Sequence, residues 1–81
     1  MTSTIYVLAS NEALARHRAV ANDSSVYTQM MKAWFDLFFL QSIEGSTCAI
    51  RLWVAEIDRI TTHDGVITRV LSCQPADQVP A

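Results

Sequence analysis

The chain has two histidines and two cysteines, whose side chains could act as a general base, a nucleophile or a metal ligand. His17 could act as a base only beside a carboxylate or nucleophile, and we interpret it as a residue at the edge of an apolar helix face. His63 stands beside Asp64 in a segment that turn formation explains. Cys48 and Cys73 form no C-x-x-C motif, and the histidines complete no zinc spacing. We therefore predict no catalytic residue, no cofactor and no metal, with both cysteines reduced and structural.

A pair of nearby acids, Glu56 and Asp58, is the other pattern that could support acid–base chemistry. On a helix these side chains point about 200° apart and would not share a substrate, whereas on a strand they lie on one face. We interpret them as part of a solvated surface. The chain has two glycines, Gly45 and Gly65, and no phosphate-binding loop, nucleophile elbow, zinc-protease motif or calcium loop. This pattern favours a protein that is not an enzyme.

The length and composition limit the number of domains and the kinds of partner that this protein can have. Its 81 residues are enough for one domain, and 51% of them are apolar while only 17% are charged. A small domain of this kind either exposes apolar surface or covers it with a neighbouring chain, and we favour the neighbour. The net charge of −2 supplies no basic surface for phosphates, so we predict no nucleic-acid partner. No segment has the pattern of a signal peptide or a membrane span, so we predict no membrane partner and a cytoplasmic location.

The aromatic side chains are concentrated in one segment, which we predict to be a helix over residues 26–41. Five of the seven aromatic residues of the chain lie there. Apolar side chains cover about half of the helix circumference, which is more than the stripe that one buried face requires. We expect an internal core that includes Trp34, Phe38, Ile50, Trp53 and Ile57. We expect a partner interface along one flank of the helix, made up of Tyr27, Met31, Phe35, Phe39 and Leu40.

The segments on either side of this helix are predicted from propensity and periodicity. Residues 4–9 are rich in β-branched and aromatic side chains and predict a strand, after which Ser10 caps a helix over residues 11–21. Residues 48–62 fit a helical apolar stripe, which we favour, although a strand with a β-bulge also fits them. A turn at residues 62–65 then leads into a final strand, which we place at residues 66–73.

These elements predict a small, helix-dominated α+β domain over residues 1–73, followed by a disordered tail at residues 74–81. The favoured element order is β-α-α-α-β, with the two strands paired. If residues 48–62 form a strand, the order becomes β-α-α-β-β, with a long C-terminal hairpin. Because a two-stranded ribbon is marginal in water, either order gains stability from a second copy of the chain.

The function that these features favour is a non-catalytic protein–protein interaction module. We expect a homodimer that regulates or inhibits another protein, because the aromatic surface exceeds what one small chain can bury. Two alternatives remain open. One is a small oligomeric enzyme with His17 or His63 as its general base. The other is a protein that binds a hydrophobic ligand in a pocket beside the aromatic helix.

Overall fold

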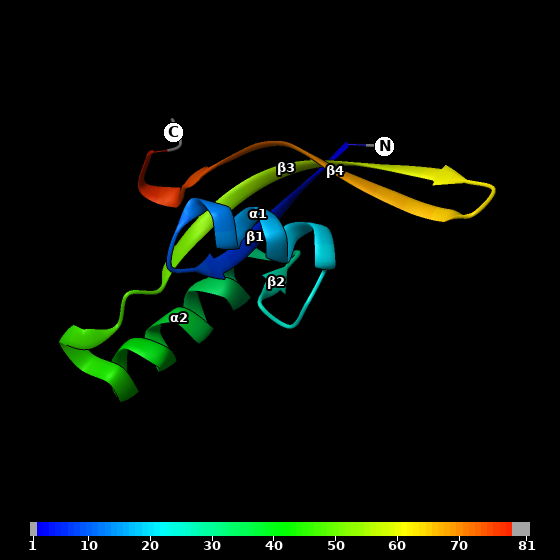
Figure 1. The fold of residues 1–81 in the computed structure, drawn as a ribbon. Helices are drawn as coiled ribbons and strands as arrows, with labels where there is room; N and C mark the ends of the chain where they lie inside the picture. Colours follow the sequence, from blue (N-terminus) through cyan, green and yellow to red (C-terminus); the bar gives the residue numbers. More distant parts are fainter. Residues whose placement is uncertain (1, 79–81) are drawn as a thin grey trace.

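A four-stranded antiparallel sheet forms the centre of the protein in the computed structural model, which describes residues 2–78 (Figure 1). Its strands lie in the order β2-β1-β3-β4, and two helices pack against it. The elements, in chain order, are β1 (Thr2–Ala9), α1 (Glu12–Ala21), β2 (Val26–Tyr27), α2 (Met30–Glu44), β3 (Arg51–Thr62) and β4 (Gly65–Pro75). Short 3-10 turns follow α2 at Gly45–Thr47 and β4 at Ala76–Gln78.

The fold is therefore a small single α+β domain, but it is not helix-dominated, because 43% of it is strand. The helix that we favoured over residues 48–62 was wrong, and so was the order β-α-α-α-β that followed from it. The alternative with a C-terminal hairpin describes the chain better, with the short strand β2 as an addition. The predicted turn at residues 62–65 is confirmed, since β3 and β4 are joined there.

The position of β3 in the sheet explains why its sequence resembled a helix. β3 lies between β1 and β4, and both of its faces are partly covered. Leu52 is buried on one face, while Trp53 and Ile57 are buried on the other. A strand buried on two faces loses the alternation of apolar and polar residues that marks a surface strand. The register with β4 shifts between Glu56 and Ile57 because Leu71 of β4 is an extra residue, whereas β3 pairs with β1 without a shift, so the bulge that the strand interpretation placed in residues 48–62 lies in β4 instead.

The two helices cover opposite faces of the sheet, and β1 contributes to both layers. Alternate residues of β1 point to opposite faces. One cluster joins three of them to the alanines of α1 and to β3, and it contains Ile5, Val7, Ala9, Ala15, Ala19, Trp53, Ala55, Ile57 and Cys73. The second cluster lies under α2 and contains Leu8, Ala33, Leu37 and Leu52. The core is consequently two thin layers with the sheet between them.

Trp53 anchors the first of these layers. Its side chain is 6% exposed, and its indole Nε1–H donates a hydrogen bond of 2.9 Å to the backbone carbonyl of Ala9. The predicted core positions Trp53 and Ile57 are thus confirmed. Ile50 is half-buried against the second layer.

The start of α1 is set by Asn11 and not, as we predicted, by Ser10. β1 pairs with β3 through Ala9, so the chain leaves the sheet only after that residue. The Asn11 backbone is extended, and its Oδ1 accepts a hydrogen bond of 2.9 Å from the backbone N–H of Leu14. This bond satisfies one of the free N–H groups at the helix start, and Glu12 in the first turn complements the macrodipole.

Replacement of this cap should have a measurable cost. We expect Asn11→Ala to lower the free energy of unfolding by about 1 kcal/mol, because the Leu14 N–H loses its acceptor. Urea denaturation followed by circular dichroism measures the change. Ser10→Ala is the matched control and should stay within about 0.5 kcal/mol of the native chain. Equal losses in the two variants would contradict the assignment of Asn11 as the cap.

The far part of the β3–β4 hairpin leaves the sheet as a two-stranded ribbon (Figure 1). Among the described residues, β1 pairs with β3 as far as Asp58, and residues 59–62 of β3 pair with β4 alone. At its other end β4 continues to Pro75, and a 3-10 turn follows at Ala76–Gln78. The first part of the predicted disordered tail is therefore strand and turn, and residues 79–81 lie outside the described residues.

Candidate protein-interaction surface

The side of α2 that meets the sheet is lined by small and medium-sized side chains. Ala33 and Leu37 are buried there, and Leu40 is half-buried. These positions are three and four residues apart, so they form one stripe on the helix. The stripe packs on Leu8 and Leu52 of the sheet. Ala33 lets the helix approach the sheet closely, and this contact needs none of the large rings of α2.

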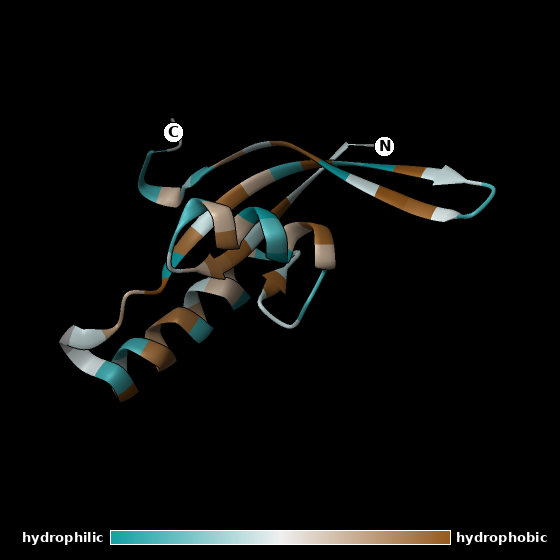
Figure 2. Cartoon of the chain, in the orientation of Figure 1, coloured by the Kyte–Doolittle hydropathy of each residue, from teal (hydrophilic) through white to brown (hydrophobic). Residues whose placement is uncertain are grey.

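The large apolar side chains of α2 point away from the sheet. We call this surface the outer face of α2 and define it as Met31, Trp34, Phe35, Phe38, Phe39 and Ile43. Met31 is 83% exposed, Phe35 is 74% exposed and Phe38 is 64% exposed. The rings of Trp34 and Phe38 lie beside each other, with centroids 6.1 Å apart. Figure 2 shows hydrophobic residues along the whole length of α2. Contiguous exposed apolar surface on this scale is characteristic of interaction sites.

The predictions for individual residues of this segment divide into two groups. Trp34 and Phe38 were predicted as internal core, and this was wrong, because both side chains lie on the outer face. The predicted interface residues Met31, Phe35 and Phe39 are exposed on that face. Whether they bind a partner stays a prediction.

The other two predicted interface residues lie elsewhere. Leu40 faces the sheet and packs at the margin of the second core layer. Tyr27 is not in the helix, because the helix begins at Met30 instead of Val26. Val26 and Tyr27 pair with β1 as the short strand β2. Helical periodicity could not reveal this, since backbone pairing with a distant strand leaves no periodic signal.

Tyr27 is joined to α2 by a hydrogen bond. Its phenol O–H donates to Oδ2 of Asp36 over 2.6 Å. Burial, the hydrogen bond to Asp36 and the negative charge of that carboxylate together raise the pKa of Tyr27 to about 12, with burial as the largest cause. This bond connects the edge of the sheet to the second turn of α2, and it therefore helps to hold the orientation in which the outer face is exposed.

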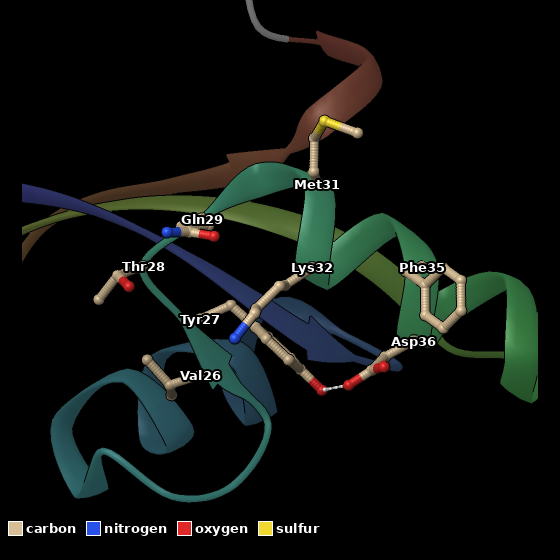
Figure 3. Close-up of a pocket in the computed structure, with 8 residues that line it drawn as sticks. All are labelled: Val26, Tyr27, Thr28, Gln29, Met31, Lys32, Phe35 and Asp36. Atoms are coloured by element: carbon tan, nitrogen blue, oxygen red, sulfur yellow. Dashed lines mark hydrogen bonds between the residues drawn. The ribbon is translucent and has the colours of Figure 1, made fainter.

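A hollow of about 760 Å³ lies beside this bond, between β2 and the first half of α2. Figure 3 shows Tyr27 and Asp36 directed toward each other, with Lys32 reaching from the helix on the same side. Both polar and apolar residues line the hollow, namely Val26, Tyr27, Thr28, Gln29, Met31, Lys32, Phe35 and Asp36. Gln29, Lys32 and Asp36 supply polar groups to this lining. The sequence suggested a pocket beside the aromatic helix, but it did not place the wall formed by Val26 and Tyr27, because that wall depends on β2 being a strand.

The residues suited to catalysis do not gather in one place. His17 is exposed on α1, and His63 is exposed in the turn at the tip of the ribbon. Cys48 is half-buried and Cys73 is buried in the first core layer, and both are free thiols. Burial raises the pKa of the Cys73 thiol. Within residues 2–78, no group of three or more histidine, cysteine or acidic side chains could hold a metal ion. A small enzyme using His17 or His63 stays a hypothesis.

The paired acids lie on the sheet, as the strand interpretation predicted. Glu56 is exposed and accepts a hydrogen bond of 3.2 Å from the hydroxyl of Thr4 on β1. Asp58 lies 3.7 Å from the guanidinium of Arg69 on β4. Both acids thus take part in contacts between neighbouring strands.

Comparisons with protein-family models, with curated proteins and with solved structures found no match to this chain. None of the helices within residues 2–78 has the length and apolar character needed to cross a bilayer. The outer face of α2 and the adjoining hollow are accordingly interpreted from their own geometry.

The Tyr27–Asp36 bond makes a prediction for alkaline pH. Because the folded pKa lies above the ordinary value of 10.0, the protonated phenol stabilises the fold fully below pH 10.0, and this stabilisation is lost as the pH rises toward about 12. In a Tyr6→Phe background, tyrosinate absorbance should report one titration near pH 12. Asp36→Asn should move that titration down toward 10.0, because the carboxylate acceptor is removed. An unchanged midpoint would contradict the role of Asp36.

Proposed function

We propose that this protein is a non-catalytic interaction module that forms a homodimer through the outer face of α2. One observation carries the proposal: Ala33 and Leu37 face the sheet, whereas Phe35 and Phe38 face the solvent. These rings contribute little to the folding of a single chain, because they are exposed in the unfolded chain as well. A second copy that covers them adds stability, because burial of apolar surface is favourable by about 25 cal/mol per Å².

The size of the outer face suits a stable dimer. A large apolar or aromatic side chain can bury about 150–250 Å². With the exposed fractions of its six residues, the outer face then offers about 700 Å² in each copy. A standard stable interface buries about 800 Å² per partner. The outer face therefore supplies most of such an interface without help from other elements.

The chemistry of the outer face also suits a contact between identical surfaces. In a twofold dimer each residue meets the same surface on the other copy, so a central charge would meet itself. The centre of the outer face is Trp34, Phe35, Phe38 and Phe39, while Lys32 lies in the first turn of α2 and Asp36 is bonded to Tyr27. Tryptophan, phenylalanine and methionine are the side chains that interfaces favour at their centres, where charged residues are depleted.

The oligomeric state tests this proposal. Light scattering across a dilution series should give a mass near twice the 9.0 kDa of one chain at micromolar concentration. The same series should show dissociation on dilution, since α1 and the sheet form a core without the partner. A mass of one chain at high micromolar concentration would contradict the homodimer.

We further propose that the dimer regulates or inhibits another protein, and acts in the cytoplasm, where the free thiols of Cys48 and Cys73 suit a reducing environment. The β3–β4 ribbon supports this proposal, because Val66 and Ile67 expose apolar surface far from α2 (Figure 1). Affinity capture with the native chain and with Ile67→Asp tests it. A protein retained only by the native chain is the expected result, and identical captures would contradict a role for the ribbon.

A second candidate function is suggested by the hollow beside Tyr27. Its volume of about 760 Å³ falls within the 300–1,000 Å³ that is typical of small-molecule sites. Met31 and Phe35 supply apolar walls, and Lys32 supplies a positive charge. A hydrophobic ligand with an acidic group would fit this lining. Native mass spectrometry of the freshly purified protein should detect a bound molecule if this function applies.

A further inference from the structure

We propose that the two α2 helices of the homodimer pack antiparallel, with the twofold axis passing at the level of Asp36 and Leu37. This inference rests on the proposed homodimer and adds the geometry of the contact between the two copies. It is carried by the distribution of the rings on the outer face and by the charges at the two ends of α2.

The rings are centred on the proposed axis. Trp34, Phe35, Phe38 and Phe39 lie symmetrically about the midpoint between positions 36 and 37. In an antiparallel pair centred there, Phe35 lies level with the partner's Phe38. Trp34 in turn lies level with the partner's Phe39. Each large ring is then level with a different ring of the partner and not with its own copy, and the central Phe35–Phe38 pairs can form tilted contacts of the kind that Trp34 and Phe38 make within one chain.

The ends of α2 carry charges that oppose its own macrodipole. Lys32 lies in the first turn, where the helix is positive, and Glu44 is the last residue, where the helix is negative. The Gln29 side chain at the N-cap makes no capping hydrogen bond. Each end is therefore electrostatically unfavourable in an isolated chain.

An antiparallel partner helix reduces the unfavourable electrostatic interactions at the two ends of α2, whereas a parallel partner helix increases them. In the antiparallel pair, Lys32 lies level with the partner's Gln41, near the negative carbonyl end of the partner helix. In a parallel pair, the two Lys32 ammonium groups and the two positive helix ends lie together. The charges thus select the antiparallel orientation, while the rings supply the contact itself.

Two positions on the outer side of α2 distinguish the orientations. Met31 and Ser42 are exposed near opposite ends of the helix and lie about 16 Å apart along its axis, at 1.5 Å per residue. In the antiparallel pair, Met31 is level with the partner's Ser42 but about 16 Å along the axis from the partner's Met31. A disulfide requires Cα atoms within about 7 Å of each other. Only the mixed pair of cysteines can then be joined.

The test is disulfide cross-linking in a Cys48→Ser background, in which Cys73 stays buried. Met31→Cys and Ser42→Cys variants are oxidised separately and as an equal mixture. We expect a covalent dimer mainly in the mixture, with the 31–42 disulfide identified by peptide mass mapping. Phe35→Asp added to both variants should abolish the cross-link, which excludes random collision.

The outcomes separate this inference from the proposed function. Strong self-linking of Met31→Cys alone would overturn the antiparallel orientation and support a parallel pair. A dimer by light scattering with no cross-link in any sample would also overturn the inference, since α2 would then lie outside the interface. A monomer by light scattering would overturn the proposed homodimer itself.

Discussion

Phe35→Asp should weaken self-association by about a thousandfold. Phe35 is 74% exposed in the single chain and lies at the centre of the outer face of α2. A hot-spot residue contributes at least about 2 kcal/mol to binding, and the twofold symmetry removes this residue from both copies at once. A loss of about 4 kcal/mol corresponds to about three orders of magnitude in Kd. Sedimentation equilibrium over a dilution series measures this change directly.

The matched control is Val20→Asp, which places the same charge on an exposed apolar position of α1. Val20 is 52% exposed and lies on the other side of the sheet from α2. We expect its self-association to equal that of the native chain. The Phe35→Asp monomer should keep its circular dichroism spectrum, because the position makes little contact within one chain. A Phe35→Asp protein that stays dimeric would remove the outer face from the interface.

Trp53→Ala should cause a much larger loss of stability than Asn11→Ala or Trp34→Ala. Trp53 is 6% exposed, packs in the first core layer beneath α1, and donates a hydrogen bond to the carbonyl of Ala9. Truncation of a buried tryptophan costs about 3–5 kcal/mol. That loss is comparable to the whole stability of a domain of this size. Urea denaturation should accordingly find much of the variant unfolded in buffer alone.

The contrasting variant is Trp34→Ala, made in the Phe35→Asp background so that self-association does not contribute. Trp34 is 38% exposed, its ring lies beside that of Phe38, and it also lines a small hollow with Ile50 and Leu52. We expect a loss of about 1–2 kcal/mol, which is smaller than that of Trp53→Ala because part of the Trp34 side chain is already exposed to solvent. Similar losses for Trp34→Ala and Trp53→Ala would mean that α2 is turned with its rings toward the sheet.

The difference between these two tryptophans shows what hydrophobic periodicity does not determine in this chain. Both lie in strongly apolar segments, and both were predicted as core from helical periodicity. Periodicity reports which residues share a face, but it does not report which face meets the rest of the protein. Ala33 and Leu37 form the less bulky apolar stripe of α2. That stripe nevertheless packs on the sheet, where it contacts Leu8 and Leu52.

The misassigned strand has a related cause. The apolar residues of β3 satisfy a helical stripe because they are buried on both faces of the sheet. Local sequence does not contain this information, since the two covering helices lie outside the segment and their packing against the sheet leaves no periodic signal in it. The pairing of Tyr27 with Tyr6 and its bond to Asp36 depend in the same way on contacts between distant segments.

Local chemistry was enough to specify β1, α1 and the turn between β3 and β4, although not the capping residue of α1, because propensity and turn residues act within a few positions of each other. The composition alone also predicted more apolar ring surface than one chain of this size can bury, since that is a matter of amounts and not of arrangement. The direction in which α2 presents its rings, the double burial of β3 and the hollow beside Tyr27 were decided by packing. Each of them depends on how surfaces from distant parts of the chain fit together, and the free energy of that fit appears only when the chain has folded.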